Sequence, residues 1–315
     1  MEEKIFHTII KEICKEEKIE IQLLSYDWII QLEKNGKVRH ITGNRFDLNP
    51  EATGDIACDK YATYEVLKSQ NVPVIEHHML FNPLRREKYI NEEGVYLDVI
   101  NYFKKNKNCL VVKPNSGCQG NGVTLCRTFK ELDTAITKLF KTSGSLSLCP
   151  YYEIQTEYRS FYLNGEILLI YGKTKPFVIG DGVSNITELI KSERLELPDN
   201  KIVESNLQKI DLEYIPKLNE KYNISWKHNL SGGAKPKILE DNLLKERIEK
   251  LVKKAGKAMN INFATIDIAH TVDDDLLVLE VNSGVCMSKF IEEIENGYDI
   301  AKKIYRKAVL DLFKN

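Results

Sequence analysis

The spacing of hydrophobic and polar positions predicts a chain in which helices and strands are mixed. The opening segment, MEEKIFHTIIKEICKEEKIE, predicts a charged amphipathic helix, and strand candidates follow at IEIQLL and DWIIQLE. Residues 1–55 are therefore expected to form a short N-terminal α/β unit. DKYATYEVLKSQN then predicts a helix over residues 59–71, and VPVIEHH predicts a strand. Residues 82–108 are polar and mixed, and they predict no clear element.

The pattern sharpens at CLVVK and GVTLC, which predict two strands. The next segment, TFKELDTAITKLF, begins at Thr128 and has Glu131 three residues later, which is the spacing of a helix capping box. YRSFYLNGEILLIYG predicts a hairpin that turns at Asn164-Gly165. The remaining predicted elements are a short helix in ITELI, an amphipathic helix over residues 241–259, a hairpin in FATIDIAHTVDDDLLVLEVN and a final helix over residues 290–313.

Composition is that of an ordinary globular protein. The 315 residues are 43% hydrophobic and 29% charged, with a net charge of −1. This balance argues against a nucleic-acid or anionic-membrane partner, and no stretch approaches the roughly 18 apolar residues of a membrane span. The seven cysteines form no C-x-x-C pair and no Cys/His cluster. They predict a reduced cytoplasmic protein without a zinc site.

The segment LVVKPNSGCQGNGVTL is rich in glycine and predicts a phosphate site. A P-loop would carry a lysine after its second glycine and lead into a helix, but Val123 follows Gly122 and the next segment alternates like a strand. A dinucleotide-binding loop would carry a glycine where Leu125 stands. What remains is a flap between two strands, whose N–H groups can approach phosphate oxygens, with Lys113 on the incoming strand. A plain flexible hairpin is the alternative.

The second hairpin is predicted to bring two carboxylates together. With a four-residue loop at 272–275, Thr271 faces Leu276, and Asp267 then lies opposite Glu280. The other face of this hairpin is apolar and carries Ile266, Ile268, Leu279 and Val281.

Opposed carboxylates on such a hairpin need a cation or a shared proton. Asn282 shares the face of Glu280, and an all-oxygen ligand set suits Mg²⁺ or Mn²⁺. Incidental acids on a solvated hairpin are the alternative. That alternative suits the acids of the turn better than it suits Asp267 and Glu280.

Together these motifs resemble the ATP-grasp superfamily. Asp59-Lys60 opening a helix is similar to the start of its ATP-binding core. EYRSFYLNG and KPFVIGDGVSNITELI are similar to the glutathione-synthase half of bifunctional glutathione enzymes, to cyanophycin synthetase and to ribosomal-protein glutamate ligases. WKHNLSGGA resembles their Arg-x-Asn-Leu…Gly-Gly segment. The resemblance covers roughly residues 55–290, with the motifs in family order.

The resemblance implies an α+β chain with the ATP-grasp fold, in which two α+β subdomains grip ATP. After the N-terminal unit it implies the start of the core over residues 56–108, a lid with the glycine flap over 109–152 and a C-terminal subdomain with the metal site over 153–315. A homodimer is also in keeping with relatives.

The resemblance implies a set of site residues by position. ATP contacts would come from Lys60, Lys113, Ser116, Gly117, Gly120, Gly122, Tyr152 and Glu153. Arg159 and Lys175 would face phosphate or the acyl-phosphate, and Asn229 would lie near the reacting centre. Asp267, Glu280 and Asn282 would hold one or two Mg²⁺ ions, or Mn²⁺. Lys175 and Lys227 stand where relatives often have arginine, so the charge is kept but the bidentate fork is lost.

The implied activity is that of an ATP-dependent carboxylate–amine ligase. Such an enzyme transfers the γ-phosphoryl group to a carboxylate, and an amine then attacks the acyl-phosphate, giving an amide, ADP and phosphate. The carboxylate and the amine would belong to amino acids or peptides. Two alternatives are an ATP-grasp kinase acting on a small molecule and a non-catalytic nucleotide-binding regulator. His228 is a candidate acid–base group.

Overall fold

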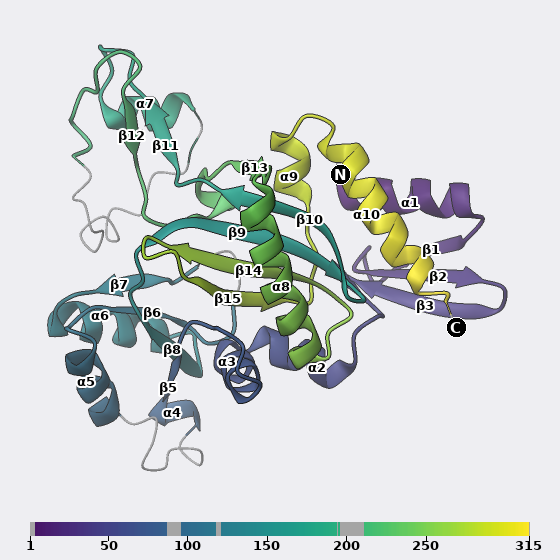
Figure 1. The fold of residues 1–315 in the computed structure, drawn as a ribbon, viewed down its shortest axis with the longest axis horizontal. Coiled ribbons are helices and arrows are strands. Elements are labelled where there is room, and N and C mark those ends of the chain that lie inside the picture. The colour runs from purple at the N-terminus through teal and green to yellow at the C-terminus, as the bar shows by residue number, and fades with distance from the viewer. Residues whose placement is uncertain (1–3, 87–95, 118–120, 194, 196–210, 315) are drawn as a thin grey trace.

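A five-stranded antiparallel sheet forms the centre of the fold (Figure 1). The computed structural model describes residues 4–86, 96–117, 121–193, 195 and 211–314. In spatial order, the central sheet contains β13 (Pro236–Ile238), β10 (Glu166–Lys173), β9 (Ile154–Leu163), β14 (Phe263–Thr271) and β15 (Leu276–Asn282). The predicted turn between β9 and β10 is confirmed, because Asn164 and Gly165 both have positive φ.

Helix α8 (Asn242–Met259) covers one face of this sheet (Figure 1). Its buried side chains pack against Ile266, Ile268 and Val281 in one hydrophobic cluster. Helices α2 (Glu51–Cys58) and α3 (Lys60–Ser69) contact the same layer at β15. Side chains alternate between the two faces of a strand, so Arg159 of β9 and Asp267 of β14 point to the face opposite α8.

A second, four-stranded sheet has the order β5-β8-β6-β7. It packs with helices α5 (Tyr96–Lys105) and α6 (Phe129–Phe140) around a core of its own, and α6 has the predicted capping box. The strand predicted at VPVIEHH is wrong for most of its length, because the strand starts at His78 and Val74 makes only a single bridge to Val278. The strands are β5 (His78–Phe81), β6 (Leu110–Pro114), β7 (Thr124–Cys126) and β8 (Ser145–Pro150), and helix α4 (Pro83–Arg86) follows β5.

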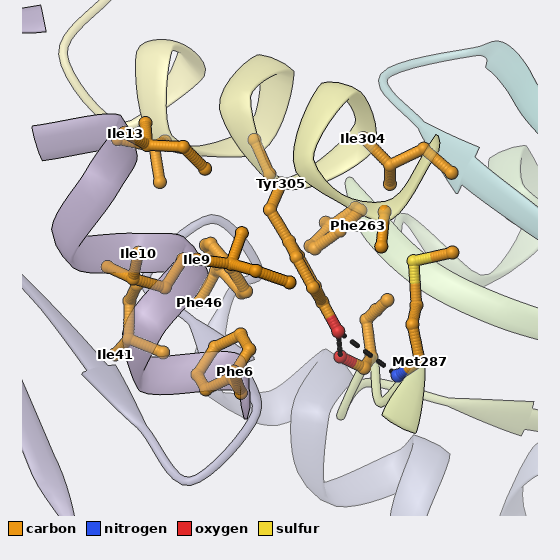
Figure 2. Packing of buried hydrophobic residues seen from close by; sticks show 14 of the residues in the cluster. Phe6, Ile9, Ile10, Ile13, Ile41, Phe46, Phe263, Met287, Ile304 and Tyr305 are labelled. Carbon is orange, nitrogen blue, oxygen red and sulfur yellow. Dashed lines mark hydrogen bonds between the residues drawn. The ribbon is translucent and has the colours of Figure 1, made fainter. Parts of the chain in front are cut away.

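The N-terminal unit shares its core with the rest of the chain. Figure 2 shows Phe6 and Phe46 gathered with Phe263 of β14 and Tyr305. The Tyr305 hydroxyl donates to the carbonyl oxygen of Val285 and accepts from the N–H of Met287, both at 3.1 Å. The unit contains α1 (Ile5–Glu17), β1 (Glu20–Leu24), β2 (Ile29–Lys34), β3 (Lys37–Thr42) and β4 (Arg45–Phe46), with the strands in sequence order.

The single final helix predicted over residues 290–313 is wrong. Two helices form instead, α9 (Ser288–Glu293) and α10 (Gly297–Asp311). Asn296 between them has a φ of 59°, which breaks the helical path. A side chain at Gly297 would lie 2.8 Å from the carbonyl oxygen of Phe290, so the turn requires glycine there.

A small unit projects from the central sheet at the top of Figure 1. It has its own apolar cluster, which includes Val178, Ile186 and Ile224. The unit contains β11 (Phe177–Ile179), α7 (Ile186–Ser192) and β12 (Lys221–Asn223), and the short 3-10 helix η3 (Leu230–Gly232) follows. Within the described residues, no helix is long and apolar enough to cross a membrane.

Candidate functional site

A cavity of about 190 Å³ is lined by residues of both large sheets. Part of its wall is apolar and belongs to one hydrophobic cluster, which contains Ile75, Val111, Val123, Cys149, Ile154, Trp226 and Leu279. The rest of the wall is polar and strongly charged. A flat apolar group and an anionic group could therefore occupy it together.

Asp267 of β14 is the most deeply held acid in this cavity. Its side chain is 2% exposed, and Arg159 of β9 donates to both of its carboxylate oxygens, at 2.8 and 2.7 Å. Lys173 of β10 donates to the same carboxylate at 3.2 Å. Burial raises the pKa of Asp267, but the two cations outweigh that effect and lower the pKa to about 2.

Lys173 also forms an ion pair with Glu157, which lies directly opposite it on β9. Burial raises the pKa of Glu157, while the charge of Lys173 opposes the rise. Neither residue was among the predicted site residues. The predicted turn at Asn164-Gly165 alone would place Lys173 opposite Thr156. A β-bulge between Ile167 and Leu169 shifts the register by one residue, so that Lys173 faces Glu157 instead.

Lys175, the predicted phosphate contact, also lines the cavity. The contacts with the buried carboxylates, however, are made by Lys173. In the described part of the chain, Lys175 has no ion pair with a carboxylate. Its positive charge acts instead on His228, where it helps to lower the pKa.

The predicted pairing of Asp267 with Glu280 is observed. The two strands end and start on either side of residues 272–275, as predicted. The predicted register at the turn is wrong, however, because His270 rather than Thr271 faces Leu276. A β-bulge between Asp267 and Ile268 shifts the register back by one residue. The two differences cancel at the carboxylate pair.

The bulge changes which residues face the cavity. Leu279 lines the cavity beside Glu280, so its predicted place on the apolar face is wrong. Asn282 pairs with Thr265 at the end of β15 and is not among the residues that line the cavity. Asp267 and Glu280 are therefore the two acids of this hairpin that reach it.

Lys60 at the start of α3 connects the flap with the carboxylate hairpin. Its ammonium group donates to the carbonyl oxygen of Gly117 at 2.8 Å and lies 3.4 Å from Glu280. Lys113 on β6 is 7% exposed and lines the cavity with Gly117. Ser116 is exposed and does not line it.

The base of the flap depends on Gly122. Its φ is +72°, and a Cβ atom there would lie 2.8 Å from Leu139 Cδ2 and 3.1 Å from Pro114 Cδ. Any other residue would therefore strain the backbone and crowd α6. Gly120 lies outside the described residues.

Tyr152 and Glu153, two of the predicted ATP contacts, lie just after β8. Tyr152 lines the cavity, whereas Glu153 does not. The carbonyl oxygen of Glu153 accepts from the N–H of Val272, and the N–H of Tyr151 donates to Cys109. Within 149–154, Tyr152 is thus better placed than Glu153 to meet a ligand.

The segment WKHN supplies four consecutive lining residues, Trp226 to Asn229. Burial lowers the pKa of Lys227 to about 8. Burial and then the charge of Lys175 lower the pKa of His228 to about 4, so this imidazole is neutral near pH 7. The predicted residue Asn229 and the candidate acid–base group His228 both lie in the cavity, and Trp226 and Lys227 add to the predicted site residues.

Comparison with known proteins identifies the architecture. Residues 218–308 match the RimK-like ATP-grasp domain. A bifunctional glutathione synthetase from Pasteurella multocida has a similar structure, with a TM-score of 0.56 at 17% identity, over 96% of this chain and 43% of that one. The ATP-grasp fold predicted from the sequence is thus confirmed.

Two relatives are similar to this ATP-grasp chain in sequence. The tetrahydromethanopterin:α-L-glutamate ligase of Methanocaldococcus jannaschii is 28% identical over 265 residues, which are 83% of this chain and 69% of the relative. Cyanophycin synthetase of Trichormus variabilis is 27% identical over 169 residues, which are 53% of this chain. That match spans only 17% of the length of the cyanophycin synthetase.

The acids of the ATP-grasp cavity can be tested for a metal. Two carboxylate oxygens offer about four acceptor positions, and Arg159 and Lys173 use three of those on Asp267. Glu280 is more exposed and pairs only with Lys60 among the described residues. No group of three or more His, Cys, Asp or Glu side chains in the described ranges could hold a metal without other ligands. The pair therefore fits Mg²⁺ that is also held by phosphate oxygens.

Proposed function

We propose that this protein binds Mg²⁺–ATP in the cavity and joins a carboxylate to an amine through an acyl-phosphate. The observation that carries the proposal is the composition of the wall, which combines an apolar slot, an opposed carboxylate pair and an excess of cations. A nucleoside triphosphate has the matching parts, namely a flat apolar base and a polyanionic chain.

The charges of the lining support a polyanionic ligand. Six cationic side chains and three carboxylates line the cavity. Ion pairs with the carboxylates engage Lys60, Arg159 and Lys173. In the part of the chain that the structure describes, Lys113, Lys175 and Lys227 make no such pair and are left to meet an anion. Desolvation of the cavity would strengthen that attraction.

The residues would divide the work as follows. Asp267 and Glu280 would hold Mg²⁺, which neutralises phosphate charge when it is bound. Lys60 and Lys113 would hold the nucleotide phosphates, and Arg159 and Lys175 would stabilise charge on the transferred phosphoryl group. On this proposal the glycine flap in residues 109–152 acts as a lid that keeps water from the acyl-phosphate.

We propose amino acids or short peptides as the substrates. The M. jannaschii relative is a tetrahydromethanopterin:α-L-glutamate ligase. L-Glutamate and short glutamyl peptides are therefore the first acids and amines to supply. The test is incubation with Mg²⁺, ATP and pairs of such compounds, with ADP release followed and products weighed by mass spectrometry.

The product separates the three candidate functions. A ligase gives ADP and a new amide, a kinase gives ADP and a phosphoester, and a regulator binds ATP without turnover. The matched variants are Asp267→Asn and Asp274→Asn, which remove one charge each from the same hairpin. Asp267 is buried in the cavity and Asp274 is exposed at the turn. Full turnover in Asp267→Asn would contradict the site assignment.

A further inference from the structure

Asn115 joins the base of the flap to helix α3. It follows β6 directly, and its side chain is 1% exposed. Its amide nitrogen donates to Asp59 Oδ2 at 2.6 Å, and its amide oxygen accepts from the N–H of Tyr61 at 3.1 Å. Its main-chain oxygen accepts from the N–H of Lys60 at 3.2 Å. One buried residue of the second sheet therefore makes three contacts with the start of α3.

These contacts complete the N-terminus of α3. A helix begins with four N–H groups that have no partner in the helix. Here the N–H of Asp59 donates to Ile56, and that of Ala62 donates to Asp59 Oδ1. Asn115 accepts from the other two. Half of the helix cap thus comes from a residue far along the chain.

The hydrogen bonds between Asn115 and the start of α3 also position two cationic residues of the cavity, Lys60 and Lys113. Lys60 is the first residue of α3, and its ammonium group donates to the carbonyl oxygen of Gly117, two residues beyond Asn115. Lys113 lies two residues before Asn115, on strand β6, which ends just before Asn115. The flap base and the start of α3 are consequently fixed to each other at both main chain and side chain.

We propose that Asn115 is a positioning residue, which sets Lys60 and Gly117, at the base of the flap, at the spacing that the nucleotide phosphates require. The proposal rests on nucleotide binding at this cavity. It does not make Asn115 a ligand contact, because Asn115 is not among the residues that line the cavity. Its effect on ATP would pass through Lys60 and Gly117.

Asn82 provides a matched control. It is 3% exposed and lies just after β5 of the same sheet. Its amide nitrogen donates to the carbonyl oxygens of Phe140 and Ser143, and its amide oxygen accepts from the N–H of Leu84. It is thus a similarly buried asparagine with a hydrogen-bonded side chain, and those side-chain bonds stay within the second-sheet unit. Replacing either asparagine should cost stability, but only Asn115 should affect the nucleotide.

The experiment is calorimetric titration of the full chain with ATP and Mg²⁺. We expect Asn115→Ala to raise the Kd about tenfold, which is about 1.4 kcal/mol, while Asn82→Ala stays within about twofold of wild type. Asn115→Asp keeps the shape of the side chain but places a carboxylate against Asp59, so the two repel and the affinity should fall as well. The exchange Asn115→Asp with Asp59→Asn restores a donor and an acceptor to the pair and should recover most of the affinity.

Each result decides the matter. Equal shifts in Kd for Asn115→Ala and Asn82→Ala, or wild-type affinity in both single variants at Asn115, would overturn the positioning role. Failure of the exchange to recover affinity would also count against it. If Asn115→Ala does not fold, the Asn115→Asp and exchange pair gives the answer. Absence of ATP binding in the wild type would overturn the proposed function itself, so the two failures are distinguishable.

Discussion

Arg159 binds both carboxylate oxygens of Asp267 through two hydrogen bonds of 2.8 and 2.7 Å between neighbouring strands. Both groups lie in the wall of the cavity, where water screens charge weakly. An ion pair of this kind adds little net stability, because desolvation offsets the attraction. Its integrity nonetheless matters, since removing one partner leaves an uncompensated buried charge.

The first prediction follows from that asymmetry. Asp267→Asn keeps the shape of the side chain but removes the counter-charge of Arg159. It also removes one of the two carboxylates that pair with Lys173. We expect the free energy of unfolding to fall by about 3–5 kcal/mol, as measured by urea denaturation. Asp274→Asn, on the exposed turn, should change it by less than about 0.5 kcal/mol. Similar losses in the two variants would show that the buried pair has no special role.

A second prediction separates Lys175, which was predicted from the sequence as a site residue, from Lys173, which was not. Lys173→Met removes the cation between Glu157 and Asp267, and the two buried carboxylates then repel each other. We expect a loss of about 3 kcal/mol or more in unfolding free energy, by analogy with a broken buried pair. Lys175→Met should cost less than about 1 kcal/mol, since no described carboxylate pairs with Lys175.

The nucleotide readout completes the comparison of these lysines. Lys175→Met should raise the Kd for ATP, or lower the turnover number, in a protein that unfolds at nearly the wild-type temperature. If Lys175→Met proves to be the destabilised variant and Lys173→Met the stable one, the assignment of Lys173 to the buried network is wrong.

The sequence predicted the fold where local patterns dominate. The capping box at Thr128 and the turn at Asn164-Gly165 depend only on residues a few positions apart, and both were predicted correctly. Element boundaries that depend on tertiary packing were not predicted. The break between α9 and α10 depends on close contact between Gly297 and Phe290, which periodicity does not reveal. The strand starting at His78 is fixed by pairing with β8, far along the chain.

In the candidate site, too, features set by local patterns were predicted and features set by distant contacts were not. The pairing of Asp267 with Glu280 was predicted correctly, although the turn and a bulge each shifted the register by one residue. Glu157 and Lys173 escaped notice because each looks like an ordinary charged residue on a half-exposed strand. Only their burial opposite each other marks them as part of the cavity. Asn115 was missed because its partners lie on α3, far from it in sequence.

A third prediction concerns the base of the flap. Gly122→Ala should strain a backbone with φ of +72° and force Cβ to within 2.8 Å of Leu139. We expect a loss of about 2–3 kcal/mol in unfolding free energy and weaker ATP binding. Gly165→Ala is the matched control, because its φ is +88° but nothing lies within 4 Å of the added Cβ. It should show only the backbone cost of about 1–2 kcal/mol and unchanged affinity.

The last prediction concerns acid stability. His77 is 5% exposed, its Nδ1 lies 2.6 Å from Ser147 Oγ, and burial, then the charges of Lys113 and Lys60, hold its pKa well below 6.5. The folded state therefore binds no proton at His77 in a range where the unfolded state does. This contribution to stability is complete above pH 6.5 and declines as pH falls toward the folded pKa.

The decline should approach about 1.4 kcal/mol per pH unit for this one group. His77→Gln removes the titrating group and should flatten the dependence of unfolding free energy on pH between 6.5 and 5 by that amount. The measurement is a series of urea unfolding curves across that pH range. An unchanged slope in His77→Gln would mean that His77 is protonated in the folded protein at the same pH as in the unfolded chain.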